Sequence, residues 1–257
     1  MSSTLRFWDS PSYEGGQMDN YLTKAKTELQ TWKLAMGKRP GLMNQFTKGL
    51  QKKANNLIPD KVHQMITATI RTTVQTVLSG AEFITGQPLG QNMDLALREQ
   101  LVQEKLKFYK KAAAAGGAGT GAGGILLGLT DFPLLLSFKF KFLFDAATIY
   151  GFDVRDYKER LYILNLFQLT FSSDERRVEV FQHILNWEDT VKNLPPNLND
   201  LDWHTFQQEY RDYIDLAKML QLVPGIGAFV GAYANYRLMN KLGETAINGY
   251  RLRILEK

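Results

Sequence analysis

A long stretch that is rich in glycine and carries no charge constrains this chain more than any other feature. Residues 112–130 read AAAAGGAGTGAGGILLGLT, nineteen residues without a charged side chain, seven of them glycine. A glycine inside a helix costs roughly 1 kcal/mol relative to alanine, so a helix of this composition needs a compensating contact. Glycines four residues apart share one helix face, where a second backbone can approach closely.

A second apolar stretch, which begins at residues 223–227, repeats this spacing with Gly227 and Gly231. The two stretches predict side-chain-poor helices that pack together, either inside a helical domain or as a shallow, re-entrant membrane contact. Neither provides the about 20 strongly apolar residues of a spanning helix. The glycines expected at the contact are Gly117, Gly121, Gly124, Gly128, Gly227 and Gly231.

The rest of the chain is amphipathic at helical spacing and shows no series of short strands with regular turns, which predicts an all-α fold. Residues 1–17 are expected to form an extended lead, and residues 18–257 a single helical domain. The alternation of Phe and Lys at residues 138–142 lies in a longer apolar run and is interpreted as helical. Helices are expected at about 19–36, 41–57, 60–78, 94–111, 132–150, 154–171, 174–187 and 203–221.

Several kinds of chemistry are excluded or disfavoured. The chain has no cysteine and only three histidines, far apart in sequence, which excludes disulfides, thiolate metal sites and a cysteine nucleophile. It contains neither a phosphate-binding GxxxxGK[ST] loop nor an HExxH metal motif. We therefore expect no metal and no cofactor. The N-terminal segment has no apolar core of the secretory kind.

Charge is unevenly distributed along the chain. Residues 29–59 carry six bases and no acid, whereas residues 153–215 carry thirteen acids and seven bases. Such asymmetry indicates that one surface attracts polyanions, although isolated lysines on solvated helices would give the same count. No recognisable nucleic-acid-reading module accompanies the basic stretch, so nucleic acid is not an expected partner.

Basic residues also flank the first glycine-rich stretch and lie among four phenylalanines after it. Lysines next to apolar aromatic residues suit an anionic lipid surface, where each cation contributes about 1 kcal/mol. The residues expected to contact lipid headgroups are Lys105, Lys107, Lys110, Lys111, Lys139 and Lys141.

Two segments carry a resemblance to a known family. Leu129-Thr130-Asp131-Phe132-Pro133, followed by an apolar helix that ends in Ala146 to Asp153, resembles the core of the EcsC protein family. The later segment 223–232 with Asn235 resembles the second signature of that family. The signatures and the helices between them cover roughly residues 20–255. The matching positions are Asp131, Pro133, Tyr150, Gly151 and Asp153 in the first signature and Pro224, Gly225, Gly227, Gly231 and Asn235 in the second.

The resemblance implies a mostly helical bacterial protein on the cytoplasmic side of the membrane, since the family's namesake is grouped with an ABC-type transporter. It assigns no catalytic residue, so binding is expected rather than catalysis. We expect a peripheral protein on the inner face of the cell membrane, docked on anionic lipid or on a membrane protein. The alternatives are an enzyme whose cavity for a lipid-like substrate is lined by Asp131, Asn235 and Tyr150, and a scaffold whose glycine helices are wholly internal.

Overall fold

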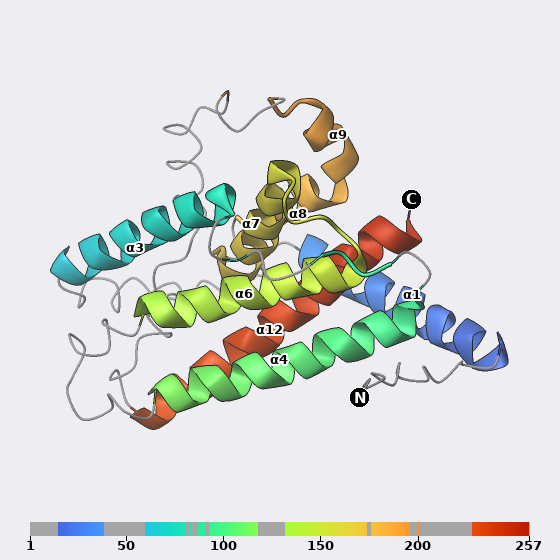
Figure 1. Cartoon of the computed structure of the whole chain (residues 1–257), viewed down its shortest axis with the longest axis horizontal. Coiled ribbons are helices and arrows are strands. Elements are labelled where there is room, and N and C mark those ends of the chain that lie inside the picture. Colours follow the sequence, from blue (N-terminus) through green and yellow to red (C-terminus); the bar gives the residue numbers. More distant parts are fainter. Residues whose placement is uncertain are drawn as a thin grey trace, which may run out of the picture.

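A computed structural model of the chain describes residues 15–38, 60–80, 83, 87–90, 93–117, 132–173, 176–195, 200 and 228–256 (Figure 1). Within these residues the elements are helices, which confirms the all-α prediction. They are α1 (Gly15–Gly37), α3 (Asp60–Ser79), α4 (Leu95–Gly117), α6 (Phe132–Tyr150), α7 (Tyr157–Phe171), α8 (Arg177–Leu185), α9 (Trp187–Lys192) and α12 (Ala228–Leu255).

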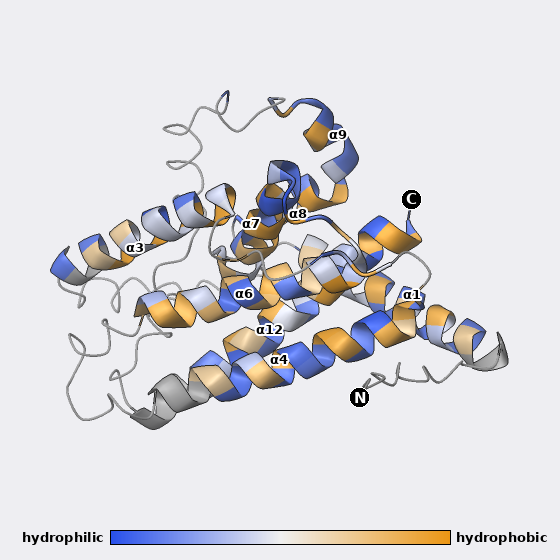
Figure 2. Cartoon of the chain, viewed as in Figure 1, coloured by the Kyte–Doolittle hydropathy of each residue, from blue (hydrophilic) through white to orange (hydrophobic). Residues whose placement is uncertain are grey.

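Three long helices, α4, α6 and α12, lie alongside one another and form the body of the molecule (Figure 1). The C-terminal helix α12 contacts α1, α4, α6 and α7, so it holds together segments from both ends of the chain. Helix α3 packs on α6 and α7, and α8 packs on α1 and α7. Hydrophobic residues concentrate on the sides where these helices meet (Figure 2).

Helix α6 is largely buried in the core, and its start follows from the sequence. Pro133 is its second residue, where a proline is tolerated because the first turn lacks N–H partners. The alternating Phe–Lys run is helical, as expected, and buries Phe140 against Phe167 of α7 with ring centroids 4.5 Å apart. Phe83, from the segment after α3, packs on Phe144 at 5.4 Å.

Two glycines in α12 permit close packing that the sequence did not indicate. A Cβ added at Gly243 would meet Leu106 Cδ2 of α4 at 2.5 Å, and one added at Gly249 would collide with Leu166 of α7. The carbonyl of Gly249 also accepts a hydrogen bond from the Tyr162 hydroxyl at 2.6 Å. Close approach to α12 therefore occurs at these positions, outside the glycine-rich stretches.

Several helix boundaries differ from the expectation. Helix α1 begins at Gly15, so its first residues belong to the expected lead, and Asp19 lies inside the helix, where its carbonyl accepts from Thr23. The helix expected at 174–187 is divided into α8 and α9, because the backbone of Asn186 (φ −99°, ψ 29°) leaves helical geometry. The helices expected at 41–57 and 203–221 lie outside the described residues.

Candidate functional site

The outer side of α4 carries exposed lysines around an exposed aromatic residue. Lys107 and Lys111 are four residues apart, so they share one face of the helix, and Phe108 lies between them with 62% of its surface exposed. An exposed phenylalanine between two solvated cations is an arrangement that suits a surface which is both anionic and apolar.

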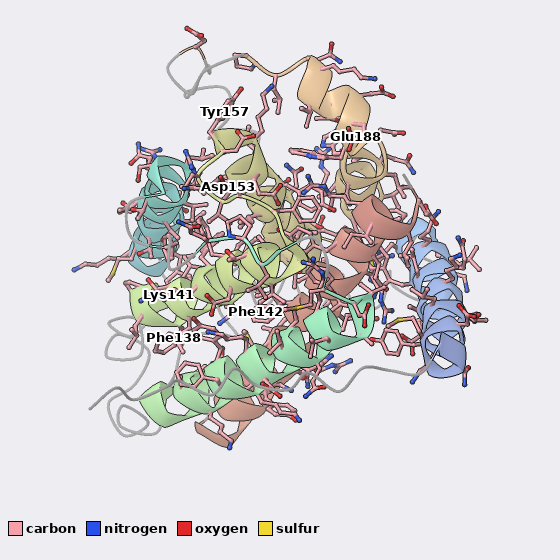
Figure 3. All side chains as sticks on the ribbon, turned by 45° about the vertical axis from the view of Figure 1, so that its right-hand side comes forward. Phe138, Lys141, Phe142, Asp153, Tyr157 and Glu188 are labelled. Atoms are coloured by element: carbon pink, nitrogen blue, oxygen red, sulfur yellow. The ribbon has the colours of Figure 1, made fainter. Side chains whose placement is uncertain are left out.

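The neighbouring helix α6 continues this surface. Leu134 is 47% exposed and Lys141 is partly exposed; because they are seven residues apart, they lie on the same side of α6. Phe138, between them, points toward α4 (Figure 3) and contacts Tyr109 with ring centroids 6.4 Å apart. We refer to Lys107, Phe108, Lys111, Leu134 and Lys141 as the α4–α6 face.

Lys105 and Lys110 lie at the two edges of α4 rather than on this face. The Lys105 ammonium forms an ion pair with Asp145 of α6 at 3.0 Å, and the same carboxylate accepts a hydrogen bond from Tyr109 at 3.0 Å. Burial and the Asp145 charge raise the pKa of Tyr109. The Lys110 ammonium lies 4.4 Å from the ring centroid of Tyr236 on α12. The edges therefore join α4 to its neighbours.

Lys139 is buried in this conformation and does not reach the surface of the molecule. Only 1% of its surface is exposed, and its ammonium donates to the carbonyl of Leu135 at 3.3 Å. The expectation of a headgroup contact does not fit this position, because residues 138–142 form a helix in which Lys139 and Lys141 are about 200° apart, so that Lys139 turns inward. Burial lowers the pKa of Lys139 to about 7.

The glycines expected to pack together are only partly described. Gly117 is the last residue of α4 and Gly231 lies in the first turns of α12. These two helix ends lie at the same end of the molecule (Figure 1), and α4 packs against α12. Gly121, Gly124, Gly128 and Gly227 lie outside the described residues, so a glycine-on-glycine contact stays a prediction.

The signature residues Tyr150 and Gly151 end α6 in a compact turn. Gly151 has φ +91°, and its N–H donates to Thr148 O while the N–H of Phe152 donates to Ala147 O, both at 3.0 Å. This is a Schellman cap, which favours glycine at the left-handed position. Asp153 follows and binds the guanidinium of Arg155 at 2.6 Å.

Arg98 of α4 fastens this turn to the rest of the protein. Its guanidinium donates to the carbonyls of Ile149 at 2.6 Å, Gly90 at 2.7 Å and Met93 at 3.0 Å. A Cβ at Gly151 would lie 3.0 Å from Arg98 Nη1. The turn that ends α6, and its contact with Arg98, therefore explain why the first signature has glycine at position 151.

The residues suggested for an enzymatic cavity do not come together. The Tyr150 ring stacks on Tyr250 of α12 at 5.0 Å. Asn235, which is buried, precedes Tyr250 by fifteen residues, or about 22 Å along the helix. Asp131, Pro224 and Gly225 lie outside the described residues. Tyr150 and Asn235 therefore cannot line the same small pocket.

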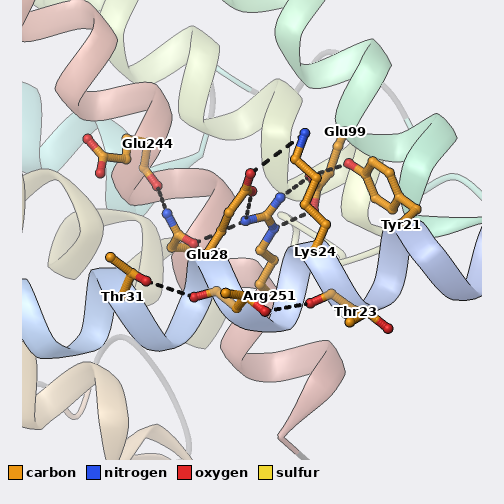
Figure 4. Close-up of polar contacts among 10 residues, drawn as sticks. Tyr21, Thr23, Lys24, Glu28, Thr31, Glu99, Glu244 and Arg251 are labelled. Carbon is orange, nitrogen blue, oxygen red and sulfur yellow. Dashed lines mark hydrogen bonds and ion pairs between the residues drawn. The ribbon is translucent and has the colours of Figure 1, made fainter.

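Buried ion pairs are the largest feature that sequence reasoning missed. Arg251 lies close to Arg253 and Lys257 in the sequence, which is typical of a basic tail, yet its guanidinium lies between helices and binds Glu99 of α4 at 2.6 and 2.7 Å and Glu28 of α1 at 2.9 Å (Figure 4). Tyr21 donates to the same Glu99 at 2.6 Å. The residues next to Arg251 in the sequence do not indicate this contact, because Glu99 and Glu28 are far from Arg251 in the chain.

A second buried pair lies close by. Arg253 binds Glu159 of α7 at 2.7 and 2.9 Å, and its guanidinium lies 3.8 Å from the ring centroid of Phe152 and 4.5 Å from that of Tyr162. Both pairs hold helices together rather than forming an open site. The part of the chain that the structure describes contains no group of three His, Asp or Glu side chains arranged to hold a metal.

None of the described helices combines the length and the hydrophobicity that a membrane-spanning segment needs.

Comparison with known proteins identifies the family of this chain. The model of the EcsC protein family matches residues 23–255. The chain is 44% identical to Protein EcsC of Bacillus subtilis (strain 168) over 230 residues, which cover 90% of this chain and 94% of that protein.

A further relative is Uncharacterized protein YdbA of Bacillus subtilis (strain 168), which is 31% identical over 166 residues, covering 63% of this chain and 60% of that protein. No solved structure shows significant similarity to the chain. The family model spans α3 to α12 and most of α1, and the first relative aligns over nearly its whole length. The chain therefore belongs to the EcsC protein family.

Proposed function

We propose that this protein is a peripheral membrane protein that docks on the anionic inner face of the cell membrane through the α4–α6 face. The observation that carries the proposal is the combination of exposed apolar and cationic side chains on two adjacent helices. Phe108 and Leu134 are exposed large hydrophobic residues, and Lys107, Lys111 and Lys141 lie beside them. The proposal has the protein bind at the interface, with no segment crossing the bilayer.

The charges and the apolar side chains would act together. Each lysine near an anionic surface contributes about 1 kcal/mol, and an apolar side chain that enters the interface adds a term in proportion to its buried area. The three lysines of the face supply about 3 kcal/mol at low salt by this rule, which is weak alone but sufficient with the two hydrophobic anchors. Tyr236, 53% exposed and next to Lys110, extends the surface toward α12.

The test is flotation of the full-length protein with lipid vesicles. Vesicles of phosphatidylcholine with about 30 mol% phosphatidylglycerol are compared with pure phosphatidylcholine, at about 50 mM and about 500 mM salt. We expect binding to the anionic vesicles at low salt and its loss at high salt. The double variant Lys107→Gln/Lys111→Gln should bind at least about tenfold more weakly.

A matched control is Lys24→Gln/Lys26→Gln on α1, which removes the same charge from exposed positions on another helix. It should bind as the unaltered protein does. Equal binding to neutral vesicles would contradict the electrostatic part of the proposal. Absence of binding to every vesicle would overturn the proposal and favour a protein partner for this face, such as the ABC-type transporter that the resemblance suggests.

A further inference from the structure

Lys139 is the most unusual side chain of the core. Its surface is 1% exposed, and the one hydrogen bond of its ammonium goes to the carbonyl of Leu135, 3.3 Å away. By contrast, Lys105 reaches a carboxylate, Asp145, at 3.0 Å. No carboxylate among the described residues pairs with Lys139. A buried ammonium without a counter-charge is unfavourable, so its retention in the core calls for an explanation.

The surroundings of Lys139 do not supply a compensating charge. Burial is the cause that lowers its pKa to about 7, and none of the ionisable groups on the helices packed against α6 contributes. These groups include Lys105 and Tyr109 on α4, Arg71 on α3, Glu159 and Arg160 on α7, and Tyr250 and Arg251 on α12. The pKa of the Lys139 amine therefore lies close to neutral pH.

The first half of α6 is apolar on both of its sides. Leu134 faces outward, whereas Leu135, Leu136 and Phe140 are buried. A helix that is apolar all round suits a protein core or a lipid environment equally. Within this segment, Lys139 is the residue whose charged form is unfavourable inside the protein.

This segment is also next to the α4–α6 face. Phe138 precedes Lys139 and contacts Tyr109 of α4, whose ring contacts the exposed Phe108 with centroids 5.2 Å apart. Figure 3 shows Phe138 between α6 and α4, with Lys141 close to it on α6. Lys139 therefore lies at the level along the bundle at which the face is exposed.

We propose that Lys139 is a latent headgroup ligand: when the α4–α6 face docks on an anionic bilayer, the first half of α6 leaves the core, its Leu and Phe side chains enter the lipid, and the Lys139 ammonium binds a lipid phosphate. The proposal rests on the proposed function, because docking must come first. The move exchanges protein contacts of Leu135, Leu136 and Phe140 for lipid contacts, and it gives the ammonium an anionic partner and contact with water.

The test uses the full-length protein with and without vesicles of phosphatidylcholine and phosphatidylglycerol. Lysines are acetylated briefly with an amine-reactive ester, and the modified peptides are quantified by mass spectrometry. Acetylation of Lys139 should rise by at least about tenfold on anionic vesicles, and that of Lys24, which is already exposed, should not change. Hydrogen exchange of the amides of residues 132–140 should rise in parallel.

Two variants separate the role of Lys139 from that of surface charge. Lys139→Met removes the buried amine, and the rise in hydrogen exchange of residues 132–140 on vesicles should become smaller. Lys141→Met, the matched control on the outer side of α6, should weaken binding but keep the rise in exchange for the molecules that remain bound.

The possible results distinguish this proposal from the proposed function. If the protein floats with anionic vesicles while Lys139 stays protected, the latent-ligand proposal is wrong and peripheral docking stands. If the protein does not float at all, both are wrong. Equal acetylation of Lys139 with and without vesicles, at a high rate, would also overturn the proposal, because the amine would already be accessible.

Discussion

Arg251 and Glu99 form a bidentate ion pair in which each side chain is only 6% exposed, with guanidinium–carboxylate distances of 2.6 and 2.7 Å. The pair joins α12 to α4, and Glu28 of α1 adds a third helix at 2.9 Å. The residues are 152 positions apart in the chain, so their pairing depends on the complete fold.

Breaking this pair should be costly. Arg251→Met would leave the Glu99 carboxylate buried without its partner, which typically costs about 3–5 kcal/mol. Urea unfolding followed by circular dichroism measures the loss. The control is Lys33→Met, which removes the Lys33–Glu256 pair at 2.7 Å, whose side chains are partly exposed; it should cost less than about 1 kcal/mol. Similar losses for both variants would show that burial does not set the strength of the Arg251 contact.

The cap of α6 predicts a difference between two glycines. Gly151→Ala places a Cβ at φ +91° and 3.0 Å from Arg98, so it should destabilise the protein by about 1–3 kcal/mol. A Cβ at Gly90 meets nothing within 4 Å, so Gly90→Ala should be nearly neutral. Thermal unfolding of both variants checks the difference, and a Gly151→Ala variant as stable as the unaltered protein would contradict the cap.

Lys139 should make stability depend on pH in the alkaline range. Its pKa in the folded protein is about 7, below the value of 10.5 expected when it is unfolded. As the pH falls from 10.5 to 7, the unfolded chain binds a proton that the folded protein does not, so stability falls, by roughly 5 kcal/mol over the whole range.

Lys139→Met should remove this pH dependence and be the more stable protein at pH 7, which unfolding in urea between pH 7 and pH 10 measures. Lys141→Met, on the outer side of the same helix, should leave the dependence intact. A stability profile of Lys139→Met that is parallel to that of the unaltered protein would show that the amine of Lys139 is not desolvated.

The exposed aromatic residue of the α4–α6 face should matter for binding and not for folding. Phe108→Ser removes a side chain that is 62% exposed, so the free energy of unfolding should change by less than about 0.5 kcal/mol. Binding to anionic vesicles, measured by flotation, should fall several-fold. Leu34→Ser on α1, where Leu34 is 69% exposed, is the control and should not alter binding. The same loss in both variants would point to a general effect of surface hydrophobicity.

Much of the fold could be predicted from local patterns. Asp94 directly before α4 and Pro133 in the first turn of α6 are local boundary signals, and the two helices begin beside them. Asn186 divides the expected 174–187 helix, although no proline or glycine marks that position. The break follows from its backbone angles, which the sequence did not indicate.

The candidate site was less predictable because spacing does not tell which side of a helix is buried. The six lysines expected to contact headgroups are close together in sequence, but they lie on different sides of α4 and α6 and differ in burial. They are Lys105, Lys107, Lys110, Lys111, Lys139 and Lys141. Lys139 and Arg251 illustrate the difficulty, since each looks like a solvated cation and each is buried. Their environment is set by residues from distant helices.

Arg98 and Arg160 illustrate how a charged side chain can fix loop positions without requiring particular neighbours. Arg160 donates to the carbonyls of Leu78 at 2.7 Å, Val154 at 2.9 Å and Arg155 at 2.6 Å, just as Arg98 binds three carbonyls around the end of α6. Every amino acid supplies a carbonyl, so the loops that these arginines hold are free to change their side chains, except at Gly151, whose left-handed backbone favours glycine. The positions of the two connections therefore depend little on their side chains, and loop residues other than Gly151 can be replaced while both guanidinium groups stay in place.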